Sequence, residues 1–133
     1  MTHPSYFETR FRVGALPDTW PEAFAIVTAY ATTGERWSDA ANAAANRRLV
    51  DRVVRSGLWH WPITGYSPAT GHAEPGWGIE LDWESACDWG GDFLQDAIYF
   101  VAGDELFVSH CDTSRGLISV GPFRERLDLT HRD

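Results

Sequence analysis

The sequence lacks the features that would place it in a membrane or outside the cell. No apolar run approaches the ~20 residues that a transmembrane helix needs. Residues 1–5 contain no basic stretch followed by an apolar one, so they do not predict a signal peptide. There are only two cysteines, Cys87 and Cys111, which are too few to predict a disulfide framework. Together these absences predict a cytoplasmic protein.

Motifs for metal binding and for nucleophilic catalysis are also missing. No two of the five histidines are spaced three or four residues apart, and there is no Cys-x-x-Cys or His-Glu-x-x-His. Gly-x-Ser-x-Gly and phosphate-binding glycine loops are absent, and Gly90-Gly91 indicates a turn. We therefore expect neither a metal site nor a cofactor.

Positive charge is scarce, with 11 basic against 19 acidic residues and a net charge of −8. This balance argues against binding to nucleic acid and favours a basic protein partner. Four arginines nevertheless fall in one predicted helix, where Asp51 is spaced to pair with Arg47 and Arg55. We expect a solvated helix face there. The alternative is a local anion-binding patch formed by Arg47, Arg48, Arg52 and Arg55.

What the sequence does contain indicates a folded chain. Its hydrophobic content is 44%, with seven tryptophans, and 133 residues suit a single domain spanning 1–133. Residues 1–22 hold three prolines and are expected to wrap the surface. The charged segment 124–133 is expected to be a frayed tail.

Alternating apolar residues predict strands at 24–30, 77–82, 96–101 and 105–110, with an edge strand near 117–120. The first of these is apolar on both faces, which indicates a central strand covered on both sides. Residues 60–66 are predicted to be extended, and Pro62 within them favours a sheet edge.

Helical spacing predicts a long helix from a cap at Ser38 or Asp39 to about Arg55, ended by Gly57. A short second helix should begin at Trp83. The element order favours an α+β fold, with a single mixed or mainly antiparallel sheet and one long and one short helix packed on it. The alternative is a ferredoxin-like two-layer sandwich.

An ordered set of short segments resembles a bacterial domain-of-unknown-function family, number 3293. The set comprises the run from Phe24 to Ala29, Asn42 seven residues before Leu49, Gly65, Glu74-Pro75, and Gln95-Asp96-Ala97-Ile98. The resemblance covers Tyr6 to Val108 and implies a small stand-alone bacterial protein, with no activity to carry over. The family usually has Asn-Pro after the first strand, where this chain has Ala31-Thr32.

Four polar or aromatic residues form the candidate ligand-binding site: Asn42, Glu74, Trp77 and Gln95. The three polar ones lie at predicted element ends or in loops, and such ends meet on one side of an α/β sheet. We expect their side chains to converge beside Trp77. Either they bind a ligand, or they staple loops together through a dry hydrogen-bond network.

These features predict a binding module with an acidic, tryptophan-rich surface, whose partner is a small molecule or a basic protein. The tryptophans concerned are Trp59, Trp61, Trp77, Trp83 and Trp89, some of which must be core. The alternative is a small enzyme that uses Glu74, with His72 nearby, as a general acid or base. The sequence does not indicate an oligomeric state.

Overall fold

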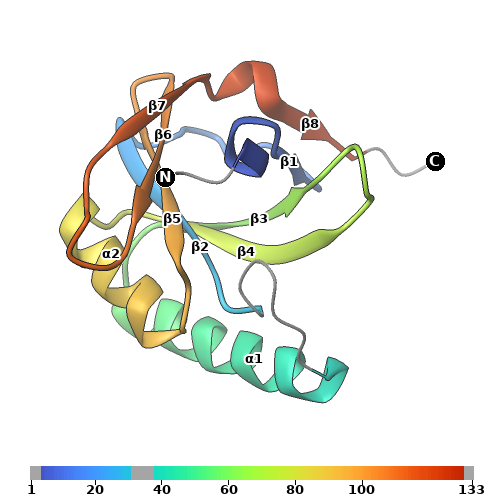
Figure 1. The fold of residues 1–133 in the computed structure, drawn as a ribbon, viewed down its shortest axis with the longest axis vertical. Coiled ribbons are helices and arrows are strands. Elements are labelled where there is room, and N and C mark those ends of the chain that lie inside the picture. The colour runs from blue at the N-terminus through green and yellow to red at the C-terminus, as the bar shows by residue number, and fades with distance from the viewer. Residues whose placement is uncertain (1–3, 31–37, 131–133) are drawn as a thin grey trace.

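An eight-stranded sheet curls around one apolar core and carries two helices on its outer face (Figure 1). The computed structural model describes residues 4–30 and 38–130. Its elements are η1 (Pro4–Phe7), β1 (Arg10–Val13), β2 (Ala23–Thr28), α1 (Asp39–Ser56), β3 (His60–Tyr66), β4 (Ala73–Ile79), α2 (Trp83–Asp92), β5 (Ala97–Ala102), β6 (Glu105–His110), β7 (Ile118–Pro122), η2 (Arg124–Arg126) and β8 (Leu127–Leu129).

The strand order is β7-β6-β5-β2-β4-β3-β1-β8. All of these neighbours pair antiparallel except β1 and β8, which are parallel. The prediction of an α+β fold with a single sheet and two helices is thus confirmed. The sheet is mixed, with one parallel pair, and the ferredoxin-like alternative does not describe its curl. β2 lies in the middle of the order, as its apolar faces predicted.

Local signals position both helices. The Ser38 hydroxyl accepts a hydrogen bond from the amide of Ala41 at 3.1 Å, and α1 ends at Gly57, whose φ of +70° suits glycine. The side chain of Asp82 caps α2 in the same way, accepting from the amide of Ser85 at 2.7 Å. The predicted bounds of α1 therefore agree with the structure.

The two faces of the sheet bury different cores. Ala25 and Val27 of β2 point outward, where they pack with buried residues of α1 and α2. Phe24 and Ile26 point to the inner face. Because side chains alternate along a strand, this division fixes which residues of each neighbouring strand face the interior of the curl.

β3 lies between β4 and β1 and is not an edge strand, contrary to the expectation from Pro62. Its pairing with β1 is restricted to Thr64, Gly65 and Tyr66. Pro62 lies outside the stretch of β3 that pairs with β1, so its missing amide hydrogen interrupts no hydrogen bond to β1. An interior strand can therefore tolerate this proline.

Both terminal segments contribute strands, where we expected a surface wrap and a frayed tail. β8 forms one edge of the sheet beside β1. An edge cluster of Arg10, Arg12, Tyr66 and Asp128 ties them together. The Nε and Nη2 atoms of Arg10 each donate to Asp128 at 2.8 Å, Tyr66 also donates to Asp128, and the Arg12 guanidinium lies 4.4 Å from the Tyr66 ring centroid. Asp128, in the segment expected to fray, thus has partners that lie 118 and 62 residues away in the sequence.

Gly90 and Gly91 lie inside α2 and do not form a turn. A Cβ on Gly90 would lie 2.6 Å from the Sγ of Cys111 and 2.7 Å from the side chain of Ile98. Glycine at this position therefore lets α2 approach the sheet closely. Cys87 and Cys111 are free and buried, and burial raises the pKa of Cys111 to about 12.

The five tryptophans between Trp59 and Trp89 pack in or against the two hydrophobic cores. Trp89 is buried, and the other four are half-buried and packed against one core or the other. Within residues 4–30 and 38–130, no helix is long and apolar enough to cross a membrane. The same residues contain no group of three His, Cys, Asp or Glu side chains that is arranged to hold a metal ion.

Candidate functional site

Glu74 and Gln95 meet at the hydroxyl of Thr28. The Oγ1 atom of Thr28 lies 3.3 Å from Oε1 of Glu74 and 3.1 Å from Oε1 of Gln95. The other carboxylate oxygen of Glu74 lies 3.0 Å from Nε2 of His72. We call Thr28, His72, Glu74 and Gln95 the inner cluster. Its four side chains are in continuous polar contact and come from three separate parts of the sequence.

Strand register places Thr28 and Glu74 on the same face. Thr28 is opposite Gly76 in the β2–β4 ladder, and Glu74 is two residues before Gly76, so both side chains face the interior of the curl. A Cβ on Gly76 would lie 2.7 Å from the carbonyl oxygen of Val27 and 2.7 Å from Cγ2 of Thr28. The glycine therefore permits the close approach on which the inner cluster depends.

The turn between α2 and β5 positions Gln95. Leu94 adopts a φ of +59°, the left-handed conformation that a leucine seldom takes, and directs the chain back toward the sheet. The backbone amide of Gln95 then donates to the carbonyl of Gly90 at 2.8 Å. Its side-chain Nε2 donates to the carbonyls of Tyr30 at 2.6 Å and Phe93 at 3.1 Å.

The hydrogen bonds of Gln95 leave the inner cluster with one more acceptor than it has donor hydrogens. Two backbone carbonyls face its Nε2, and since carbonyls only accept, the amide nitrogen must point at them and Oε1 must point at Thr28. The Thr28 hydroxyl has a single hydrogen for the oxygens of Gln95 and Glu74. When Glu74 is ionised, one of these two acceptors therefore has no hydrogen from Thr28.

The inner cluster reaches solvent at one end. The side chain of Glu74 is 25% exposed and that of His72 is 64% exposed, whereas Thr28 and Gln95 are half-buried. An added molecule can thus reach the carboxylate without unfolding the sheet.

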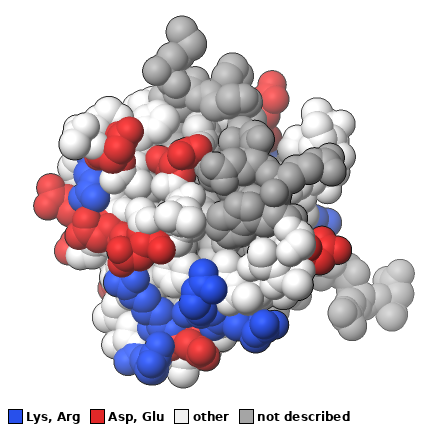
Figure 2. Space-filling model, turned by 60° about the horizontal axis from the view of Figure 1, so that its bottom comes forward, with Lys and Arg blue, Asp and Glu red and all other residues white. Residues whose placement is uncertain are grey.

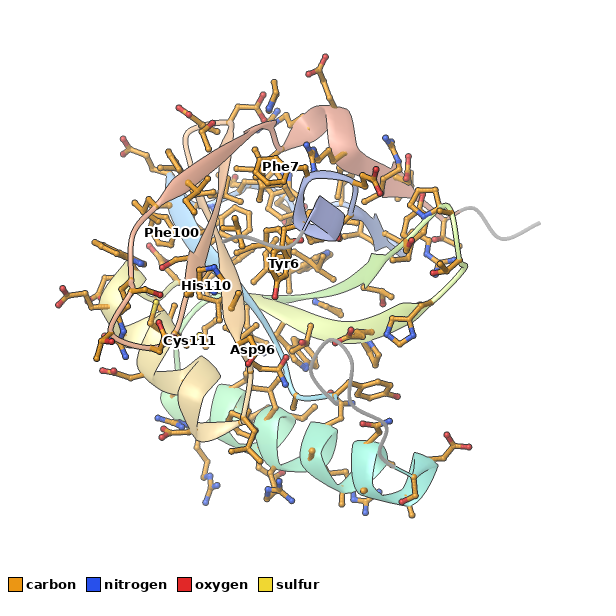
Figure 3. All side chains as sticks on the ribbon, viewed as in Figure 1. Tyr6, Phe7, Asp96, Phe100, His110 and Cys111 are labelled. Carbon is orange, nitrogen blue, oxygen red and sulfur yellow. The ribbon has the colours of Figure 1, made fainter. Side chains whose placement is uncertain are left out.

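Aromatic rings surround the neighbouring part of the inner face. Tyr6 of η1 lies edge-on to Tyr99 at 6.1 Å and to His110 at 6.4 Å between ring centroids, and Figure 3 shows Tyr6 close to His110. The Tyr99 hydroxyl donates to the carbonyl of Tyr6 at 3.4 Å. Burial raises the pKa of Tyr99, so the phenol stays protonated and remains a hydrogen-bond donor.

The other two predicted site residues lie elsewhere. Trp77 points to the outer face, opposite to Glu74, and its ring centroid is 5.6 Å from that of His60. Asn42 is half-buried near the start of α1, the helix that packs on that outer face. Thr28 was not among the site residues predicted from the sequence. The available signal was its position: it is the polar residue on the face of β2 that carries Phe24 and Ile26.

A protein-family model described as "Protein of unknown function (DUF3293)" matches residues 27–98. The chain belongs to this family. The DUF3293 match runs from β2 into β5 and therefore includes every residue of the inner cluster. No curated protein and no solved structure matches the chain. The dipeptide Ala31-Thr32, where the sequence departs from the resemblance, lies outside the described residues.

Proposed function

We propose that this DUF3293 protein is a binding module whose inner cluster takes a ligand or partner side chain rich in hydrogen-bond donors. The shortage of one proton around Thr28 carries the proposal. A purely structural role would be better met by a network in which every acceptor has a protein donor, because each such hydrogen bond contributes about 0.5–1.5 kcal/mol. An ammonium or guanidinium group would supply the missing hydrogen and neutralise Glu74.

The charge of the whole chain supports the same class of ligand. A net charge of −8 attracts cations and basic partners and repels phosphates. The sequence predicted either a small molecule or a basic protein as the partner. Both can present the same recognised group, a cation that donates hydrogen bonds. The five tryptophans between Trp59 and Trp89 are half-buried or buried, so the acidic side chains, more than an aromatic surface, would recognise the partner.

The test is a titration with methylguanidinium chloride as the probe, followed through backbone amide shifts in NMR spectra. We expect saturable shifts at Thr28, Glu74 and Gln95, with a dissociation constant of about a millimolar because the probe is small. Glu74→Gln should abolish them. Glu105→Gln, a change of the same kind at an exposed acid on β6, should bind as the wild type does. Equal shifts in the wild type and in Glu74→Gln would refute the proposal.

One observation favours the second candidate, an enzyme: the 3.0 Å contact between His72 and Glu74 joins two titratable groups at the exposed end of the inner cluster. Such a pair suits proton transfer. An enzyme should hydrolyse activated esters such as p-nitrophenyl acetate with saturation, and Glu74→Gln and His72→Asn should each remove that activity. A binding module should show no turnover of the ester, either in the wild type or in the two variants.

A further inference from the structure

The two helices of the outer face carry charged stripes of opposite sign. On α2, Glu84, Asp88 and Asp92 are spaced four residues apart and are exposed. On α1, Arg48, Arg52 and Arg55 are spaced four and three residues apart and are exposed or half-buried, with the exposed Asp51 as the one acid among them. We call these the acidic stripe and the basic stripe. Figure 2 shows arginines gathered at the lower side of this view, directly beside a group of acidic side chains.

The stripes meet where Arg52 bridges the helices. Its Nη1 atom lies 2.7 Å from Oδ2 of Asp92, and its guanidinium lies 4.2 Å from the centroid of a Trp89 ring. The second ion pair in this region joins Arg115 to Asp88 at 2.8 Å. The two stripes are therefore held side by side on a single face of the molecule.

Internal ion pairs match three of the six stripe residues and leave Arg48, Arg55 and Glu84. Among residues 4–30 and 38–130, no side-chain carboxylate forms an ion pair with Arg48 or Arg55, and no basic side chain pairs with Glu84. Like charges four residues apart repel one another on a helix. Asp92, moreover, is the last residue of α2, where the helix dipole disfavours an anion. These two effects oppose the arrangement in the isolated chain, and the ion pairs of Asp88 and Asp92 offset them only in part.

We infer that the two stripes form a self-complementary surface for a second copy of this chain. A two-fold axis between adjacent patches of opposite charge lays the basic stripe of each copy on the acidic stripe of the other. A purely acidic partner or a nucleic acid would match the basic stripe alone and be repelled by the acidic one. Leu94, which follows α2 and is 65% exposed, adds an apolar contact beside Asp92. This inference does not depend on the proposed binding site.

Sedimentation velocity over about 10 to 500 µM protein tests it, because exposed ion pairs give weak association. The dissociation constant should rise at least about tenfold between about 50 mM and about 500 mM salt, since screening weakens such pairs. Arg48→Glu with Arg55→Glu should reduce self-association, and so should Glu84→Arg with Asp88→Arg. Asp18→Arg with Glu22→Arg, an equal change of charge at exposed positions before β2, should leave it unchanged.

Mixing the two stripe variants gives the decisive measurement. One variant then presents acidic groups on both helices and the other presents basic groups on both, so a mixed dimer should form at least as readily as the wild-type dimer. Three outcomes would each overturn the inference. The wild-type protein stays monomeric throughout, the stripe substitutions leave self-association unchanged, or the mixed pair fails to associate.

Discussion

The inner cluster and the edge cluster each contain one carboxylate, but the two carboxylates differ in how many hydrogen bonds they receive. Asp128 receives two hydrogen bonds from Arg10 and one from Tyr66. Glu74 shares a single hydroxyl hydrogen with Gln95 and otherwise contacts His72. Exposure does not explain the contrast, because the two carboxylate side chains are 36% and 25% exposed. In the edge cluster, protein donors occupy both carboxylate oxygens and tie two strands together. In the inner cluster, the carboxylate can still accept a hydrogen bond from an added donor.

The largest effect should come from Gly76→Ala, which prevents the close approach of β4 to β2 at the inner cluster and leaves the edge cluster intact. The new methyl group would overlap a backbone carbonyl that cannot move independently of β2. We expect a loss of about 1–3 kcal/mol in the free energy of unfolding, measured by urea denaturation.

Gly14→Ala is the matched control, because nothing lies within 4 Å of the added Cβ there. Its urea midpoint should stay close to that of the wild type. If both variants unfold at the wild-type midpoint, the close approach at Gly76 is not required for folding.

Asp128→Asn should have the next largest effect. The amide keeps one acceptor oxygen but presents hydrogens to Arg10 or Tyr66, so the staple between β1 and β8 is broken. After allowance for the exposure of this pair, we expect a destabilisation of about 1–2 kcal/mol in urea. Asp18→Asn, at an exposed acid, should cost nothing measurable. Equal midpoints for the two variants would show that the edge cluster does not contribute to stability.

The same carboxylate should give the protein an acid-sensitive step. Hydrogen bonds from Arg10 and Tyr66 lower the pKa of Asp128 to about 2, from 3.8. Because the unfolded chain takes up this proton more readily, the stabilisation is complete above about pH 4 and is lost as the pH falls toward 2. The difference in stability between the wild type and Asp128→Asn should therefore shrink by about 1 kcal/mol over that interval. A difference that stays constant from pH 5 to pH 2 would contradict the assignment.

Glu74→Gln should have the smallest effect, although it makes the same acid-to-amide change. The new amide can donate to Thr28, which then donates to Gln95, so every acceptor between these residues gains a hydrogen. We expect the free energy of unfolding to stay within about 0.5 kcal/mol of the wild type, or to rise slightly. A loss of unfolding free energy as large as that of Asp128→Asn would mean that Glu74 holds strands together as Asp128 does. The contrast between the two clusters would then disappear.

Much of the fold could be predicted because its signals are local. Ser38 and Gly57 mark the ends of α1, and Gly103, with a φ of +63°, forms the turn between β5 and β6. The strand from Ala73 begins earlier than its alternation predicted, since pairing with β3 continues through Pro75. β1 and β8 could not be placed in the sheet, because each is short and depends on its partner strand.

The sequence by itself determined the helix ends, the central strands and the polar side chains available for a site. Those features depend on capping, turn residues and periodicity within a few neighbouring positions. Only the tertiary structure decided which polar groups meet. The contacts of Thr28 with Glu74 and Gln95 span 46 and 67 residues, and the contact of Arg10 with Asp128 spans 118. Such contacts are set by strand order and by the curl of the sheet, which place Trp77 on one face and Glu74 on the other.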